Sequence, residues 1–178
     1  MSEQIKPLIM KHYGVSPWEI NVITSILDKR FLTEEEEIEN TYEEKFVSHL
    51  EIAFPYSFND EFFKWFDFKE WDRLKGVFKE MKRRRGNGKA LRIELNFSGE
   101  PNIKFLIESD ESQWFKMEVE KIDFVELLPY HLDEEKLPMG VNSVIYNFDQ
   151  EAARWRLNTV FTDEKKFVNT ENGWKLTT

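Results

Sequence analysis

The hydrophobic pattern changes its period in the middle of the chain, and this change constrains the fold more than any other feature. From Trp71 to Met81 apolar residues recur every three or four positions, which is typical of an amphipathic helix. From Leu91 to Ile107 they alternate with polar residues on both sides of a central turn, which is typical of a hairpin with one buried face. The pattern predicts an α+β fold in which a helix over about residues 67–85 packs on an antiparallel sheet.

Local signals mark both ends of this helix. Asp67 can accept hydrogen bonds from the first unpaired N–H groups, and Glu70 completes a pair that resembles a capping box. The helix is expected to end in a run of cations before Gly86, because positive side chains suit the carbonyl end and glycine can adopt a left-handed conformation.

The remaining segments predict N-terminal helices followed by a mainly antiparallel sheet built from hairpins. Residues 3–12 fit a short helix, Ser16-Pro17-Trp18-Glu19 starts a second helix with a capping box, and Thr33 to Glu36 carries a similar signature. Residues 46–54 fit a helix or a strand, and we expect helix into the mid-forties followed by extended chain. The other expected elements are a short helix at 59–66, a strand at 114–119 extended or followed by 122–128, an irregular connection at 129–140, paired strands at 143–148 and 153–161, and a tight turn at 171–173.

Length and composition bound the domain organisation and the environment. The 178 residues predict one α+β domain spanning 1–178, with an N-terminal helical subdomain over 1–52 as an alternative. The absence of cysteine excludes disulfides and thiolate metal sites. Because the sequence has neither an apolar run long enough to span a bilayer nor the apolar core of a signal peptide, we expect a cytoplasmic protein with no membrane partner.

One basic segment stands out in an acidic chain. The formal net charge is −9, yet Lys79 to Arg92 holds seven basic residues and one acidic residue. Arginines beside a glycine-containing loop would suit a phosphate group or a nucleic-acid backbone. Alternatively, these cations stabilise the helix end or pair with the seven acidic residues between Glu34 and Glu44, and we favour this alternative. The candidate binding residues are Lys82, Arg83, Arg84, Arg85, Asn87 and Lys89.

The N-terminal segment offers a second candidate for nucleic-acid binding. Apolar residues at Ile9, Ile20 and Ile23, with Gly-Val-Ser between them, form a register that resembles helix-turn-helix DNA-binding motifs. That resemblance implies two helices joined by a tight turn, with the second helix reading DNA. The expected recognition helix brings few cations, so we favour a structural helix hairpin. The residues concerned are Gly14, Ser16, Asn21 and Thr24.

The sequence holds no recognisable catalytic constellation. His49 and Glu51 would share a face if they lay on a strand, but the sequence supplies no evident third metal ligand. The acidic neighbours of His131 are expected to form a solvated loop. The aromatic run from Phe62 to Phe66 could be an interaction patch, but we expect it to be core. No residue is therefore assigned to catalysis, a cofactor or a metal, and no cofactor is expected.

These features favour a non-catalytic protein-interaction or regulatory module that binds a protein partner or associates with itself. The alternative is a nucleic-acid or phosphate-binding protein that uses residues 82–89, together with the helix-turn-helix-like N-terminus. A second alternative is an enzyme of unknown class, which a pocket combining His49 or His131 with two carboxylates would favour.

Overall fold

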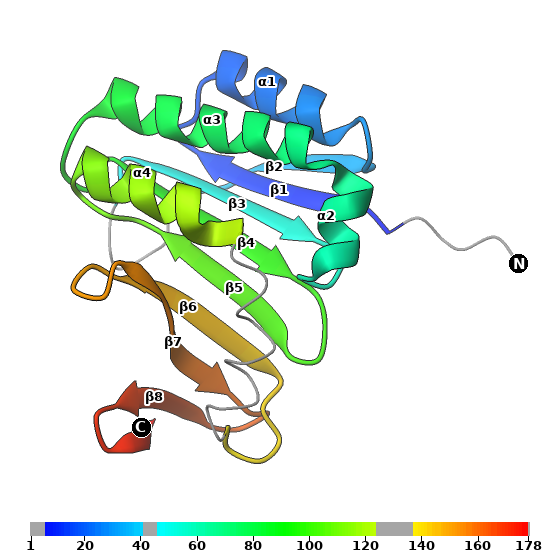
Figure 1. The fold of residues 1–178 in the computed structure, drawn as a ribbon. Coiled ribbons are helices and arrows are strands. Elements are labelled where there is room, and N and C mark those ends of the chain that lie inside the picture. Colours follow the sequence, from blue (N-terminus) through cyan, green and yellow to red (C-terminus); the bar gives the residue numbers. More distant parts are fainter. Residues whose placement is uncertain (1–5, 41–45, 124–136, 178) are drawn as a thin grey trace, which may run out of the picture.

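A computed structural model describes residues 6–40, 46–123 and 137–177. In this part of the chain four helices pack on one nine-stranded mixed sheet, which confirms the predicted α+β class (Figure 1). The helices are α1 (Pro17–Leu27), α2 (Asp60–Phe66), α3 (Phe68–Arg85) and α4 (Ser112–Glu120), and α4 leads into a 3-10 turn over Lys121–Asp123. The strands are β1 (Leu8–Tyr13), β2 (Thr33–Glu37), β3 (Ser48–Phe54), β4 (Leu91–Phe97), β5 (Asn102–Ile107), β6 (Ser143–Asp149), β7 (Arg154–Phe161), β8 (Lys166–Thr170) and β9 (Gly173–Thr177).

The strand order is β2-β1-β3-β4-β5-β6-β7-β8-β9, and five of the eight pairings are antiparallel. The parallel pairs are β1–β2, β3–β4 and β5–β6. Each parallel pair is joined by a connection that contains helix, because parallel neighbours require a long crossover whereas antiparallel neighbours can be joined by a short turn. The three parallel pairs in this mainly antiparallel sheet are therefore the three whose strands are connected through helices.

One hydrophobic core lies between the helices and one face of the sheet. Alternate residues of β3 and β4, including Leu50, Ile52 and Leu95, are fully buried and pack in the same cluster as Trp71 and Phe78 of α3. Because side chains alternate across a strand, the residues between them point to the opposite face. That opposite face, which we call the polar face, carries polar residues of β3, β4 and β5, among them His49, Glu51, Glu94 and Lys104.

The elements with strong local signals are where they were predicted. Ser16 caps α1 in a reciprocal capping box with Glu19. Asp67 caps α3, its side chain accepting a hydrogen bond from the backbone N–H of Lys69, and Gly86 ends this helix with a φ of 80°. The β4–β5 hairpin, the β6–β7 pair, the β8–β9 turn and the short helix α2 also match the prediction.

Three segments differ from the prediction. The segment expected as a helix at 3–12 contains β1, whose Leu8 and Met10 alternate into the core. The capping signature at Thr33 does not start a helix, because this segment pairs with β1 as β2 and carries its glutamates at the surface. The segment expected as a strand at 114–119 lies in α4, which buries Phe115 and Val119 one helical turn apart. In each case a long-range contact outweighs an ambiguous local pattern.

Other predictions are resolved in part. Residues 48–54 form β3, which agrees with the expected extended chain. The strands β1 and β2 belong to the same sheet as the rest, and the number of domains stays a prediction. The predictions for residues 3–5, 41–45 and 124–136, including His131, lie outside the described residues.

Candidate functional site

Two members of the basic segment are built into the fold. Lys82 is 1% exposed, and its Nζ donates hydrogen bonds to the carbonyl oxygens of Gly88 and Asp110 at 3.1 and 3.0 Å. Arg85 donates to both carboxylate oxygens of Glu19 at 2.7 and 2.8 Å. Both side chains are engaged inside the fold, and their role in ligand binding stays a prediction.

The neighbouring arginines lie at the surface but have a partner on their own helix. Glu80 accepts from Arg83 at 2.6 and 2.8 Å and from Arg84 at 3.2 Å. The Arg83 hydrogen bonds, with those of Arg84, lower the pKa of Glu80 to about 2. The Arg84 guanidinium also lies 4.6 Å from the ring centroid of Trp18.

Within the described residues, the basic segment forms ion pairs with Glu80, Glu19 and Glu120 and, through Arg92, with Glu94 and Glu108. Residues 34–40 of the acidic run lie in and after β2, and residues 41–44 lie outside the described residues, so the predicted pairing with this run stays a prediction. Asn87 is also engaged within the fold, because its side-chain oxygen accepts from the backbone N–H and the hydroxyl of Ser112. Lys89 is exposed.

The helix-turn-helix interpretation and the helix-hairpin alternative are both wrong, because a strand precedes the turn. Gly14 joins β1 to α1 with a φ of 65°, and a Cβ there would lie 2.4 Å from the carbonyl oxygen of Val47. Ser16 acts as the helix cap. Asn21 is exposed, and the Thr24 hydroxyl donates to the carbonyl oxygen of Ile20 at 2.9 Å.

The aromatic run of α2 divides between core and surface. Three of its residues, Phe62, Phe63 and Phe66, are buried, as expected of core. Trp65 is 41% exposed and lies beside Tyr56, which is 36% exposed, with ring centroids 4.8 Å apart. Both rings contact the buried Phe31, so this pair is held in place from beneath.

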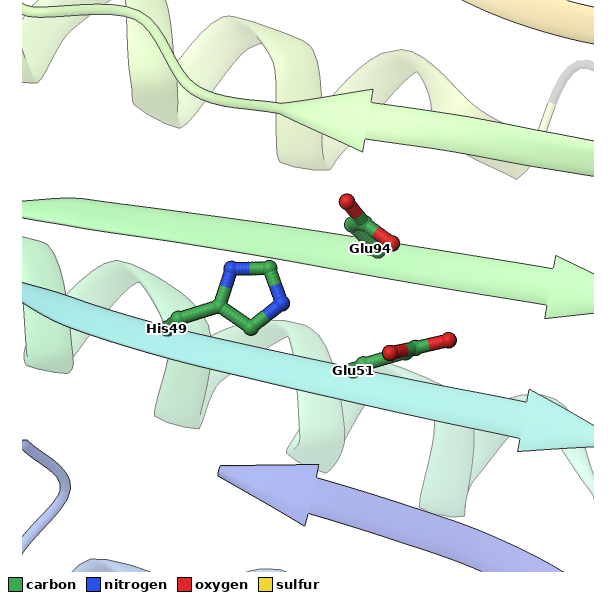
Figure 2. A group of neighbouring side chains, drawn as sticks. All are labelled: His49, Glu51 and Glu94. Carbon is green, nitrogen blue, oxygen red and sulfur yellow. The ribbon is translucent and has the colours of Figure 1, made fainter. Parts of the chain in front are cut away.

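The structure adds a third side chain to the His49 and Glu51 pair that the sequence analysis identified. His49 and Glu51 lie two residues apart on β3, and Glu94 of β4 is directly opposite Glu51 in the parallel pair. Figure 2 shows their side chains projecting from these two strands. One ligand atom from each residue lies within 4.8 Å of the others. We call this group the His49 cluster.

Burial and charge shape the His49 cluster. His49 is fully buried and stacks on Tyr13 of β1, with ring centroids 5.5 Å apart and planes 10° apart. Burial lowers the pKa of His49, although Glu94 opposes this effect, so the ring is neutral at neutral pH. Glu94 is only 4% exposed, and its oxygens lie 3.5 Å from Arg92 and 3.5 Å from Lys104.

A cavity of about 480 Å³ borders the cluster. Asn96 and Lys104 line it, and both touch the cluster: the Asn96 amide donates to Glu51 at 2.9 Å, and Lys104 lies beside Glu94. The cavity extends over the ends of five strands, from Ala53 on β3 to Phe161 on β7. The cluster therefore has a hollow beside it large enough for a small molecule or several waters.

The third member of the His49 cluster, Glu94, could not be found from sequence spacing. Glu94 sits within a strand that was correctly predicted, but the β3–β4 pairing spans two helices. The sequence pattern did place both Glu94 on β4 and Glu51 on β3 among the polar residues of their strands. Only the register of the pair shows that these two carboxylates face each other.

The buried Glu118 should make the stability of the protein depend on pH. Glu118 of α4 accepts from the backbone N–H groups of Glu108 and Ser109, yet burial raises its pKa to about 8. The folded protein therefore keeps a proton that the unfolded chain releases, and the free energy of unfolding should fall as pH rises from about 4.5 to 8.

Replacing Glu118 with glutamine should make the protein more stable than the parent at about pH 8 and flatten this slope, because glutamine resembles the protonated acid. Urea denaturation at about pH 5 and about pH 8 measures both effects. An unchanged slope in the variant would mean that another group causes the pH dependence.

These features define an α+β protein whose sheet has helices on one face and the His49 cluster on its polar face. Protein-family models, curated proteins and solved structures contain no match to this chain. Within the described residues, no helix combines the length and apolar character needed to cross a membrane.

Proposed function

We propose that the chain is a protein-interaction module that associates with a second copy of itself. The observation that carries this proposal is the exposed ring pair of Tyr56 and Trp65, and together with the exposed Leu32 these residues are called the Trp65 surface. Leu32 is 58% exposed and directly follows Phe31, the residue beneath both rings. Exposed tryptophan and tyrosine side chains on a rigid base are typical of the residues that dominate binding energy at protein interfaces.

The charges around Trp65 suit a symmetric contact. On α2, Glu61 and Lys64 are both exposed beside Trp65, and neither forms an ion pair with another described residue. When two copies of a helix pack antiparallel about a two-fold axis, a residue on one helix faces a different residue on the other. Lys64 of one protomer can then face Glu61 of the partner subunit, while the aromatic rings fill the space between the helices.

Other exposed apolar residues offer a weaker basis for an interface. Met139 and Val47 are 97% and 73% exposed, and Phe68 is 54% exposed and stacks on the buried Phe63. Isolated exposed apolar residues are common on monomeric proteins and need no partner. The Trp65 surface differs because two exposed rings, those of Tyr56 and Trp65, contact each other and the same buried ring of Phe31.

Light scattering coupled to gel filtration, over a wide range of protein concentration, tests this proposal. We expect a concentration-dependent dimer in the parent and a monomer in Trp65→Ala. Lys64→Glu should also weaken the dimer, since it places two acidic residues opposite each other. The double variant Glu61→Lys/Lys64→Glu should restore it, because the pair is then present with its charges exchanged.

The matched control is Lys116→Glu, which makes the same charge change at an exposed position on α4. It should leave the dimer unchanged. A parent protein that remains monomeric at all concentrations would overturn the proposal, and so would a double variant that dimerises no better than Lys64→Glu.

A further inference from the structure

We propose that His49, Glu51 and Glu94 bind one divalent transition-metal ion of the zinc class on the polar face of the sheet. This inference is independent of the Trp65 surface, which lies at the exposed side of α2. It rests on the geometry of the three side chains, on their charge, and on the hollow beside them.

The geometry needs only side-chain rotation to reach a metal site. A zinc ion bound at about 2.0–2.2 Å by nitrogen and oxygen holds its ligands about 3.3–3.5 Å apart. The three ligand atoms already lie within 4.8 Å of one another and come from two paired strands (Figure 2). Strands inside a sheet are rigid, so β3 and β4 hold the three side chains close together before any ion binds.

The charges at this position favour a bound cation. Glu51 and Glu94 face each other across two strands, and like charges directly opposite destabilise a sheet. The flanking Lys104 and Arg92 offset part of this repulsion, but they lie 3.5 Å from Glu94, beyond the 2.7–2.9 Å of a close charge-assisted hydrogen bond. A divalent ion between the carboxylates would compensate both of them at once.

Neighbouring side chains hold two of the proposed ligands in place. Tyr13 stacks on the imidazole of His49 and fixes the plane of the ring. Asn96 donates to one oxygen of Glu51 and leaves the other oxygen for a metal. Such supporting contacts set the direction of metal ligands and raise metal affinity.

The ligand set selects the class of metal. One imidazole with two carboxylates suits zinc and similar divalent transition metals, whereas magnesium and calcium prefer oxygen ligands alone. Three protein ligands leave at least one coordination position for water or a ligand atom. The cavity is lined by Asn96 and Lys104, which contact Glu51 and Glu94, whereas the three proposed ligands do not line it themselves.

The test is isothermal titration of Zn²⁺ into the tag-free, chelator-treated full chain, with elemental analysis of the dialysed complex. We expect one tightly bound equivalent per chain and an increase in the melting temperature. Glu51→Gln and Glu94→Gln should each weaken binding at least tenfold. Glu51→Gln is the safer variant for folding, because Glu51 is partly exposed and glutamine can still accept from Asn96.

A third variant separates a metal site from a purely structural ion-pair network. Lys104→Met removes a cation that competes for Glu94, so it should tighten Zn²⁺ binding several-fold. The control His12→Gln alters another histidine–carboxylate pair, that of His12 and Glu35, and should leave the stoichiometry unchanged. Absence of stoichiometric uptake by the parent would overturn the inference. Uptake that Glu51→Gln and Glu94→Gln leave unchanged would also overturn it.

Discussion

Replacing Arg85 with alanine is expected to lower the free energy of unfolding by about 3–5 kcal/mol, because Glu19 would remain as a buried charge without its partner. Glu19 is 3% exposed and receives both arms of the Arg85 guanidinium. Arg85 also donates to the hydroxyl of Ser48 at 2.9 Å and to the carbonyl oxygen of Gly14 at 3.3 Å. One side chain therefore joins the end of α3 to the start of α1 and to β3.

The control for this prediction is Arg83→Ala. Arg83 carries the same charge two residues earlier, but it is exposed and, among the described residues, pairs with Glu80 of its own helix. Exposed pairs of this kind contribute little to stability, so the variant should unfold close to the parent in urea. Equal destabilisation by the two variants would show that the Arg85–Glu19 contact is not what stabilises this junction.

The Arg85–Glu19 pair also predicts a response to acid. Burial alone would raise the pKa of Glu19, but hydrogen bonds from Arg85 and from the backbone of Ser16 outweigh it and lower the pKa to about 2. A lowered pKa means that the pair stabilises the fold above the ordinary value of 4.5 and that this contribution is lost as pH falls towards 2. The Arg85→Ala variant should lose less stability than the parent over this range.

Local signals made much of the fold predictable. The capping box at Ser16, the cap at Asp67 and the alternation from Leu91 to Ile107 act within a few residues, and the structure confirms the elements that they predicted. Consecutive residues of a helix point about 100° apart, which is why Arg83 and Arg84 are exposed while Arg85 is partly buried.

Contacts between distant segments account for what the sequence could not show. A run of glutamates at β2 has poor intrinsic strand propensity, and only its pairing with β1 makes it a strand. The partner of Arg85, Glu19, lies 66 residues away in the sequence and outside the acidic run that was expected to pair with the basic segment. The His49 cluster depends on the register of two strands separated by two helices. Each of these features depends on pairing or packing that no local pattern encodes.

Replacing Trp71 with alanine is expected to cost about 3–5 kcal/mol of unfolding free energy, because a large buried side chain would leave a cavity. Trp71 is fully buried on α3 and contacts three aromatic rings of α2, those of Phe62, Phe63 and Phe66. The loss should therefore loosen the packing between the two helices. Chemical denaturation followed by circular dichroism measures the effect, and Trp65→Ala is the matched control because its ring is 41% exposed.

A second substitution at Trp71 separates volume from polarity. Its indole N–H is buried and has no hydrogen-bond acceptor in the described chain. Trp71→Phe removes that unpaired donor and less side-chain volume than Trp71→Ala does. It should therefore lower the free energy of unfolding far less than the alanine variant. Because α2 presents Trp65, the alanine variant should also weaken the proposed dimer, whereas the phenylalanine variant should keep it. An alanine variant as stable as the parent would mean that Trp71 does not anchor α2 to α3.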